Sequence, residues 1–195
     1  MPLPRKGTKY VARALGHVHS GVPVVVAVRD MLRLAKTARE ARIMVKQKMI
    51  KVNGRIVQDI REPITLFNIL EVGKIYRLII LPTGRFSLVE TKDNFRLSRV
   101  QNKTMLKGKK MQLNFHDGSN IITNEKTNVG DTFEIDNTGK VKKIITFAKG
   151  RDAFVISGRS VGNSGKISEV KDGKASVKLE NGKEVMLETK HIMVL

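Results

Sequence analysis

The four histidines are the residues whose chemistry is most easily recognised, at positions 17, 19, 116 and 191. His17-x-His19 could supply two nitrogens to a metal ion, but no third ligand with suitable spacing stands near it in sequence. His116-Asp117-Gly118 contains a possible His–Asp pair, although Asp-Gly after a strand is better explained as a turn. Cysteine is absent, which excludes disulfides, thiolate metal sites and cysteine nucleophiles. We therefore expect no enzymatic activity, no cofactor and no metal.

Lysine and arginine offer a different chemistry, the binding of phosphate. The chain has 37 Lys and Arg against 18 Asp and Glu, a formal net charge of +19. Such a charge is relieved by a polyanion, and each neutralised phosphate of a nucleic acid also releases a counterion. An anionic membrane would favour a basic amphipathic helix with Trp or Phe, whereas this chain has no Trp and its charge is spread widely. Nucleic acid is the expected partner, with no membrane and no small-molecule substrate.

The longest apolar run, Pro23–Val28, is far shorter than the roughly 20 residues that cross a bilayer. We expect a soluble, intracellular protein. Residues 151–195 hold eight basic and six acidic side chains and are nearly balanced, whereas the basic excess is distributed over the rest.

Residues 23–48 must position the first group of basic side chains. Pro23 suits a first helical position, and an apolar stripe from Val24 to Ala35 predicts a helix with Arg29, Arg33 and Lys36 together on its other face. Thr37 and Glu40 form a capping box, in which Glu40 reaches back to the cap. The helix that follows would turn Ala38, Ala41, Met44 and Val45 inward and Arg39, Arg42 and Lys46 outward.

A β-hairpin follows this second helix, because Ile50 and Val52 alternate with polar residues before the turn Asn53-Gly54. Double-stranded RNA hides its base edges in a deep groove, so we expect phosphate and shape recognition by a basic face. Thr37 would add its helix N-terminus, which favours an anion. A solvated basic face is the alternative. The predicted RNA-binding residues here are Arg29, Arg33, Lys36, Thr37, Arg39, Arg42, Lys46, Lys48, Lys51 and Arg55.

The first 22 residues are predicted to be a basic arm, which either remains a disordered tail or becomes ordered on RNA. Its predicted contacts are Arg5, Lys6, Lys9 and Arg13.

From about Val72 onward, alternating strands are separated by turns, which suggests small barrels or a twisted meander. The expected strands are 74–80, 110–115, 132–135 and 141–147. Between them lies Arg96 to Lys110, which has six basic residues, including Arg99, and no acidic residue. It is either a solvated loop or a phosphate contact, and its predicted contacts are Lys103, Lys107, Lys109 and Lys110.

The last segment, Ala153–Leu195, is predicted to be a separate small barrel of about five strands, with turns at Asp172-Gly173 and Asn181-Gly182. Gly158, Gly162 and Gly165 would permit tight turns or a close backbone approach, and they lack the Gly-Lys-Ser/Thr ending of a P-loop. Its predicted contacts to RNA or to a neighbouring protein are Arg159, Asn163 and Lys166.

The fold class is therefore predicted to be α+β. The expected parts are a basic arm (1–22), a two-helix and β-hairpin RNA-binding domain (23–72), a central β-rich, barrel-like domain (73–150) and a small β-barrel (151–195).

Two segments also resemble known modules. Residues 24–72, with Arg29-Asp30-Met31-Leu32 and Ala35–Arg42, look like the S4 RNA-binding domain, and Ala153–Ile167 resembles a KOW motif of an SH3-like barrel. The archaeal and eukaryotic ribosomal protein S4e family of the small subunit has these modules in this order around a central β domain. Leu113–Gly118 is also similar to that family. The family usually has a longer basic N-terminal extension and a tail after the barrel.

This resemblance implies a structural constituent of the small ribosomal subunit, in the cytoplasm. Its implied partners are small-subunit rRNA and neighbouring ribosomal proteins, without formation of a homo-oligomer. The alternative is a free RNA-binding regulator or RNA chaperone. S4-like domains also occur in RNA-modifying enzymes, but residues 73–150 contain no recognisable catalytic site.

Overall fold

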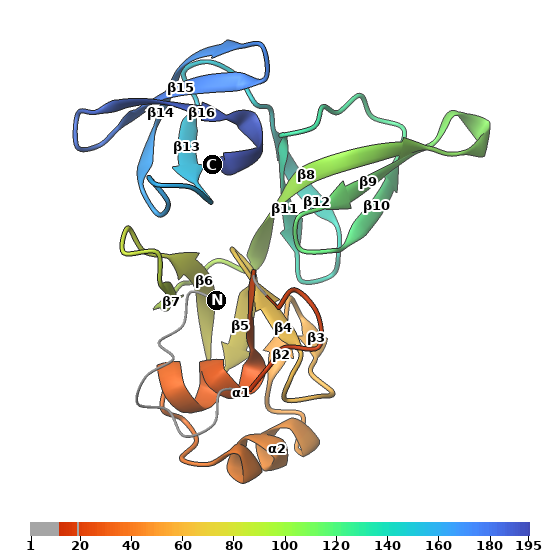
Figure 1. Ribbon diagram of the computed structural model, residues 1–195. Helices are drawn as coiled ribbons and strands as arrows, with labels where there is room; N and C mark the ends of the chain where they lie inside the picture. The colour runs from red at the N-terminus through yellow and green to blue at the C-terminus, as the bar shows by residue number, and fades with distance from the viewer. Residues whose placement is uncertain (1–11, 19) are drawn as a thin grey trace. The chain divides into compact units, whose positions relative to one another are not determined.

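The protein is mostly β with few helices, and a computed structural model describes residues 12–18 and 20–195 (Figure 1). The chain divides into two compact units. Unit 1 contains the described residues up to Arg96 together with the turn Asp136–Gly139, and unit 2 contains Leu97–Ile135 and Lys140–Leu195. Hence the predicted boundary at residues 72 and 73 does not coincide with the division between the units.

Unit 1 begins with a strand where a helix was predicted. β1 (Gly21–Pro23) pairs with β4 (Pro63–Thr65), so Pro23 ends a strand and caps the short helix α1 (Val24–Val26). A π-helical turn η1 (Ala27–Met31) follows, and Arg33 then adopts a φ of +56°, which a right-handed helix cannot contain. The prediction that Arg29, Arg33 and Lys36 share one helical face was therefore wrong. Because residues 22–28 are all buried, this segment has no polar face that could set a helical period.

The second predicted helix is α2 (Ala38–Lys46), capped by Thr37, whose Oγ1 accepts a hydrogen bond from the Glu40 amide at 3.2 Å. The Glu40 carboxylate reaches one residue further than predicted and accepts from the Lys36 amide at 2.7 Å. The predicted division of the helix is confirmed. Ala38, Ala41, Met44 and Val45 are buried or half-buried, and Arg39, Arg42 and Lys46 are exposed.

A five-stranded antiparallel sheet covers these helices, in the order β3-β2-β5-β6-β7. Its strands are β2 (Lys51–Val52), β3 (Arg55–Ile56), β5 (Ile69–Val72), β6 (Lys74–Ile80) and β7 (Phe86–Glu90). Asn53 and Gly54 have φ values of +52° and +77°, the conformation expected of the predicted two-residue turn. Because β5 and β6 are neighbouring strands, the sheet continues across the predicted domain boundary.

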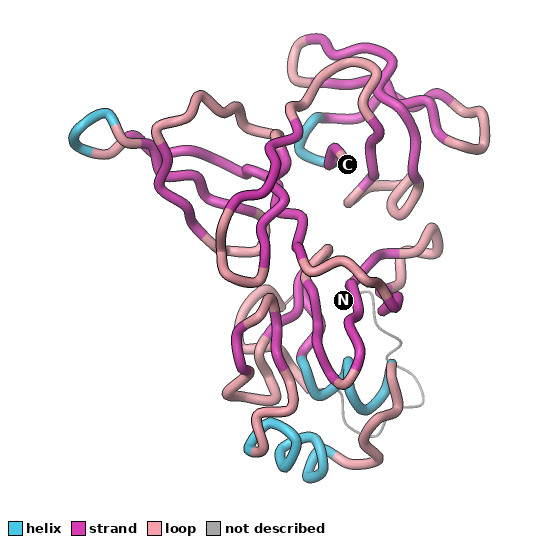
Figure 2. The backbone as a smooth tube through the Cα atoms, turned by 180° about the vertical axis from the view of Figure 1, so that it is seen from behind, coloured by secondary structure: helices cyan, strands magenta, loops and turns pink. Residues whose placement is uncertain are grey.

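Unit 2 contains a first antiparallel sheet, in the order β10-β9-β8-β11-β12 (Figure 1). Its strands are β8 (Phe95–Met105), β9 (Met111–Phe115), β10 (Asn120–Thr123), β11 (Thr132–Asp136) and β12 (Val141–Ile145). Three of them match predicted strands. β8 corrects the loop predicted from Arg96, since it is the longest strand of the sheet, and the short 3-10 turn η2 (Lys107–Lys109) forms the tip of its hairpin with β9 (Figure 2). The core lies around Phe115 and Phe133, whose rings meet edge to face at 5.3 Å.

A second five-stranded sheet completes unit 2, in the order β16-β15-β14-β13-β17. Its strands are β13 (Asp152–Val155), β14 (Ser164–Lys171), β15 (Lys174–Leu179), β16 (Glu184–Glu188) and β17 (Ile192–Val194), the last preceded by the turn η3 (Thr189–His191). The predicted turns at Asp172-Gly173 and Asn181-Gly182 join β14 to β15 and β15 to β16. The two predicted roles of the glycines also hold. Gly158 and Gly162 have positive φ, whereas a Cβ on Gly165 would lie 2.4 Å from the Lys178 carbonyl oxygen.

Candidate nucleic-acid interface

The outer face of α2 presents three cations, Arg39, Arg42 and Lys46, all exposed. The buried side chains Ala41 and Val45 fix the rotation of the helix, so that these cations point away from the core. Within the described part of the chain, no carboxylate forms an ion pair with any of the three. Their charges therefore face solvent, on the outward side of the helix that the sequence predicted.

The C-terminal part of this face meets the loop before β4, and the two enclose a shallow hollow of about 230 Å³ lined by Arg42, Lys46 and Asp59 among others. The backbone amide of Arg61 donates to the Asp59 carboxylate at 2.7 Å. This hydrogen bond lowers the pKa of Asp59, and the positive charges of Arg61 and Arg42 lower it further. Asp59 therefore remains ionised at neutral pH and stabilises its own loop through the hydrogen bond from Arg61.

The basic residues preceding α2 differ in whether an internal carboxylate neutralises their charge. Arg29 is half-buried and makes a bidentate ion pair with Asp30, with both bonds at 2.7 Å, which raises the pKa of Arg29. Its charge is therefore largely neutralised within the protein. Arg33 and Lys36 are exposed and lie in the segment that leads into α2. At Thr37 the internal carboxylate of Glu40 already lies at the helix N-terminus, so an external anion would have to compete with it.

The hairpin that follows α2 extends the basic surface. Lys48 and Lys51 are exposed. Arg55 forms an ion pair with Glu62 at 3.1 Å, yet its side chain remains 80% exposed. Of the predicted N-terminal contacts, Arg13 is exposed, and Arg5, Lys6 and Lys9 lie outside the described residues.

Among the basic residues between Arg96 and Lys110, Arg99 lies in the interior of unit 2. Arg99 is 4% exposed, and its guanidinium donates to the carbonyl oxygens of Ile192 at 2.9 Å and Thr189 at 3.1 Å. Burial lowers its pKa. Arg99 is thus held within unit 2 and is not a surface charge, so the phosphate contacts predicted for this segment at Lys103, Lys107, Lys109 and Lys110 do not extend to it.

The lysines of this segment are closer to the surface. Lys103 donates to the carbonyl oxygen of Thr127 at 3.1 Å and is otherwise exposed. Lys107 and Lys110 are exposed at the η2 tip, where Lys109 is described only by its backbone.

In the loop between β13 and β14, Arg159 is exposed, but the Asn163 amide turns inward and donates to the Ser160 carbonyl at 2.9 Å. Asn163 therefore stabilises its own loop. Lys166 lies 3.8 Å from Asp152 in a well-exposed ion pair.

Nothing in the described residues assembles a metal site, since no group of three potential ligands is found there. His116 accepts a hydrogen bond from the Arg99 amide at 3.1 Å. His191 forms a hydrogen bond with Ser157, a Ser–His pair that the sequence did not reveal because 34 residues separate the two. No carboxylate orients the ring of His191 among the hydrogen bonds of the described part, so the pair lacks the third group of a catalytic triad.

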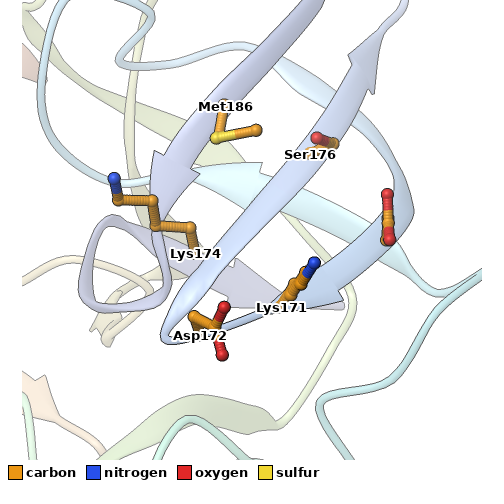
Figure 3. A pocket seen from close by; sticks show the side chains of 6 residues that line it. Lys171, Asp172, Lys174, Ser176 and Met186 are labelled. Carbon is orange, nitrogen blue, oxygen red and sulfur yellow. The ribbon is translucent and has the colours of Figure 1, made fainter.

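A further hollow of about 320 Å³ lies on the outer side of the β14–β15 hairpin, lined by Glu169, Lys171, Asp172, Lys174, Ser176 and Met186 (Figure 3). It contains neither histidine nor cysteine, and amines alternate with carboxylates along it. None of the helices in the described range is long and apolar enough to span a membrane.

Comparison with known proteins identifies the family. The sequence model of the Ribosomal family S4e matches residues 72–142. Small ribosomal subunit protein eS4 of Pyrobaculum arsenaticum is 36% identical over 203 residues, which cover 94% of this chain and 85% of that protein. The protein of the same name from Methanocaldococcus jannaschii is 33% identical over 86% of this chain and 76% of its own length.

The fold agrees with that comparison. The crystal structure of the 30S ribosomal protein S4e from Thermoplasma acidophilum superposes with a TM-score of 0.77 at 27% identity, covering 90% of this chain and 95% of the other. On the relatives' identity and coverage, this chain belongs to the S4e family of small-subunit ribosomal proteins.

Proposed function

We propose that this protein is a structural constituent of the small subunit of the cytoplasmic ribosome, which binds rRNA and supports subunit assembly and translation. The single observation that carries the proposal is the α2 face, where Arg39, Arg42 and Lys46 lie exposed and form no ion pair among the described residues. Arginine guanidinium groups fit phosphate oxygens, and a rigid helix holds them at fixed spacing.

The resemblance of two segments to known modules supports a separate role for each of them. α2 and the β2–β3 hairpin would act as an S4-like RNA-binding domain, and residues 151–195 as a KOW-type, SH3-like barrel. Lys48, Lys51, Arg55, Lys107 and Lys110 would extend the contact to phosphates, and the nearly balanced charge of the last sheet suits neighbouring ribosomal proteins. We propose no catalytic role, no cofactor and no homo-oligomer.

Gradient sedimentation of a cell extract tests this function, with the protein quantified in every fraction. We expect about one copy per small subunit and retention after a high-salt wash. Recovery near the top of the gradient would contradict the proposal and point to a free RNA-binding regulator or RNA chaperone.

A further inference from the structure

The outer face of the β8, β9 and β10 strands is covered by uncharged amide side chains. The strand register places Asn102, Asn114 and Asn120 side by side in one cross-strand row. Thr104, Gln112 and Ile122 form the next row. The opposite face of the same strands carries Leu113 and Phe115, which are buried in the core. All six side chains of the two rows therefore share the face directed away from that core.

The amides of this face are joined to one another. Gln112 Nε2 donates to Asn114 Oδ1 at 2.9 Å, and Asn114 Nδ2 donates to Asn102 Oδ1 at 2.6 Å. These two hydrogen bonds fix the orientation of the amides. They leave the carbonyl oxygen of Gln112 at one end of the network and the amino group of Asn102 at the other. The face consequently offers an acceptor and a donor at fixed positions, while Asn102, Thr104 and Asn120 remain exposed.

Such a composition is unusual for a solvent-facing sheet, because asparagine is disfavoured in strands. The last sheet of the same unit shows the ordinary pattern, with Lys166, Lys178 and Glu184 in one cross-strand row. Charge is also distributed asymmetrically around the amide face. From Arg96 to His116 the chain has no acidic residue, and Lys107 and Lys110 are exposed at the hairpin tip that ends this face (Figure 2).

We infer that the amide face of β8–β9–β10 binds the shallow minor groove of double-stranded RNA, with its amides contacting 2′-hydroxyls and base edges. The 2′-hydroxyl both donates and accepts, as an amide does, and the minor groove of an A-form helix is wide enough to receive a sheet face. Lys107 and Lys110 then lie where the flanking phosphates pass. Ile122, which is 59% exposed, supplies an apolar contact to a ribose. The inference rests on the proposed rRNA-binding function, and it adds that this face distinguishes RNA from DNA through contacts to the 2′-hydroxyl groups.

The amide and lysine contributions can be separated by their salt dependence. Each lysine–phosphate contact changes the slope of log affinity against log salt concentration, whereas an amide contact releases no counterion. The probes are a mixed-sequence RNA duplex of about 20 base pairs, which spans successive minor grooves, and the DNA duplex of the same sequence.

We expect the triple variant N102A/Q112A/N114A to bind the RNA duplex roughly tenfold or more weakly with an unchanged salt slope. The wild-type preference for RNA over DNA should disappear in this variant. Lys107→Ala with Lys110→Ala should instead flatten the slope and retain the preference. Gln101→Ala is the matched control, since Gln101 is an exposed amide at the bulge beside the rows and lies outside them.

A second variant guards against loss of folding. Asn120→Asp keeps the size of the side chain, leaves the hydrogen bonds among Gln112, Asn114 and Asn102 intact and places a carboxylate among the proposed RNA contacts, and it should weaken RNA binding at an unchanged melting temperature. If both variants bind RNA as the wild type does, with the same ratio of RNA to DNA affinity, the inference is overturned and the face belongs to a protein partner. If the wild type shows no salt-dependent RNA binding at all, the proposed function fails instead.

Discussion

At the level of single residues, Arg39 and Arg42 decide whether α2 is an RNA-binding face or a solvated one. Replacing both with Ala should leave the fold intact, because both side chains are exposed and alanine favours a helix. The double variant should bind rRNA more weakly, and each lost phosphate contact should reduce the log–log salt slope by about 0.7–0.9. Titrations at several salt concentrations measure it.

The control for that prediction is Lys74→Ala, since Lys74 is exposed but already forms an ion pair with Glu90 at 2.9 Å. It should change the slope less than either arginine does. An unchanged slope in the Arg39/Arg42 double variant would remove α2 from the interface.

Asp59 provides a second prediction for a single residue, which concerns how stability depends on pH. Its pKa is lower in the folded protein than in the unfolded chain, because the Arg61 amide and nearby cations stabilise the carboxylate. Its stabilising effect is therefore fully present above the unfolded pKa of about 4 and is lost as pH falls through the folded pKa. Asp59→Asn should lower the free energy of unfolding at neutral pH by less than about 1 kcal/mol, because the pair is exposed, and the melting temperature should fall slightly with it. The difference from the wild type should vanish in acid, and melting curves that stay parallel down to low pH would contradict this account.

At the level of secondary-structure elements, what the sequence predicts correctly depends on how local the signal is. α2 was predicted together with its cap, because Thr37, Glu40 and the apolar positions all lie within one short segment. The Asn53-Gly54 turn was predicted for the same reason, since both residues favour positive φ. The exposed cations of the candidate site were predicted along with the helix that bears them.

The errors arise where residues far away in the sequence determine the conformation or the burial of a segment. β8 is rich in Asn, Gln, Lys and Arg and has a poor intrinsic preference for strand, so its pairing with β9 and β11 imposes the conformation. Arg99 is buried because carbonyl oxygens some 90 residues away accept its hydrogen bonds. No residue near Arg99 in the sequence indicates these acceptors. The predicted first helix was misplaced because β1 pairs with β4, about 40 residues later.

Gly165 allows β14 and β15 to approach each other closely. Its φ is not positive, so the cost of a side chain there is steric alone. A Cβ would lie 2.4 Å from the Lys178 carbonyl oxygen and 2.9 Å from the Leu179 Cα. Gly165→Ala should therefore lower the free energy of unfolding by about 1–3 kcal/mol, as overpacking typically does. Chemical denaturation measures this loss.

The matched control for Gly165 is Gly16→Ala, since Gly16 has no positive φ and no atom of the described residues lies within 4 Å of an added Cβ. That variant should be neutral or gain up to about 1 kcal/mol from the reduced entropy of the unfolded chain. Equal effects of the two substitutions would show that β14 and β15 are not tightly packed at this glycine.

At the level of the whole molecule, the net charge of +19 opposes the compact state of the free protein. Some exposed cations form internal ion pairs, such as Lys74 and Lys190, whereas those of the α2 face form none among the described residues. Repulsion among the unpartnered charges is screened by salt, since the Debye length falls to about 10 Å at 0.1 M. The same salt weakens the attraction between these charges and RNA phosphates. Salt should thus act in opposite directions on the free protein and on its RNA complex.

This opposition yields a prediction for melting temperature. Raising NaCl from about 20 mM to about 300 mM should raise the melting temperature of the free protein, because the screening length shrinks severalfold over this range. The same change should lower the melting temperature of the complex with rRNA, because bound RNA stabilises the fold only in proportion to the logarithm of its affinity, about 2.7 kcal/mol at a hundredfold excess over Kd. Arg39→Ala with Arg42→Ala should reduce both effects, since these side chains contribute to the repulsion and to the binding. Differential scanning calorimetry with and without rRNA measures both trends. Parallel shifts in the two samples would mean that electrostatic attraction to phosphate is not what holds the protein on its RNA.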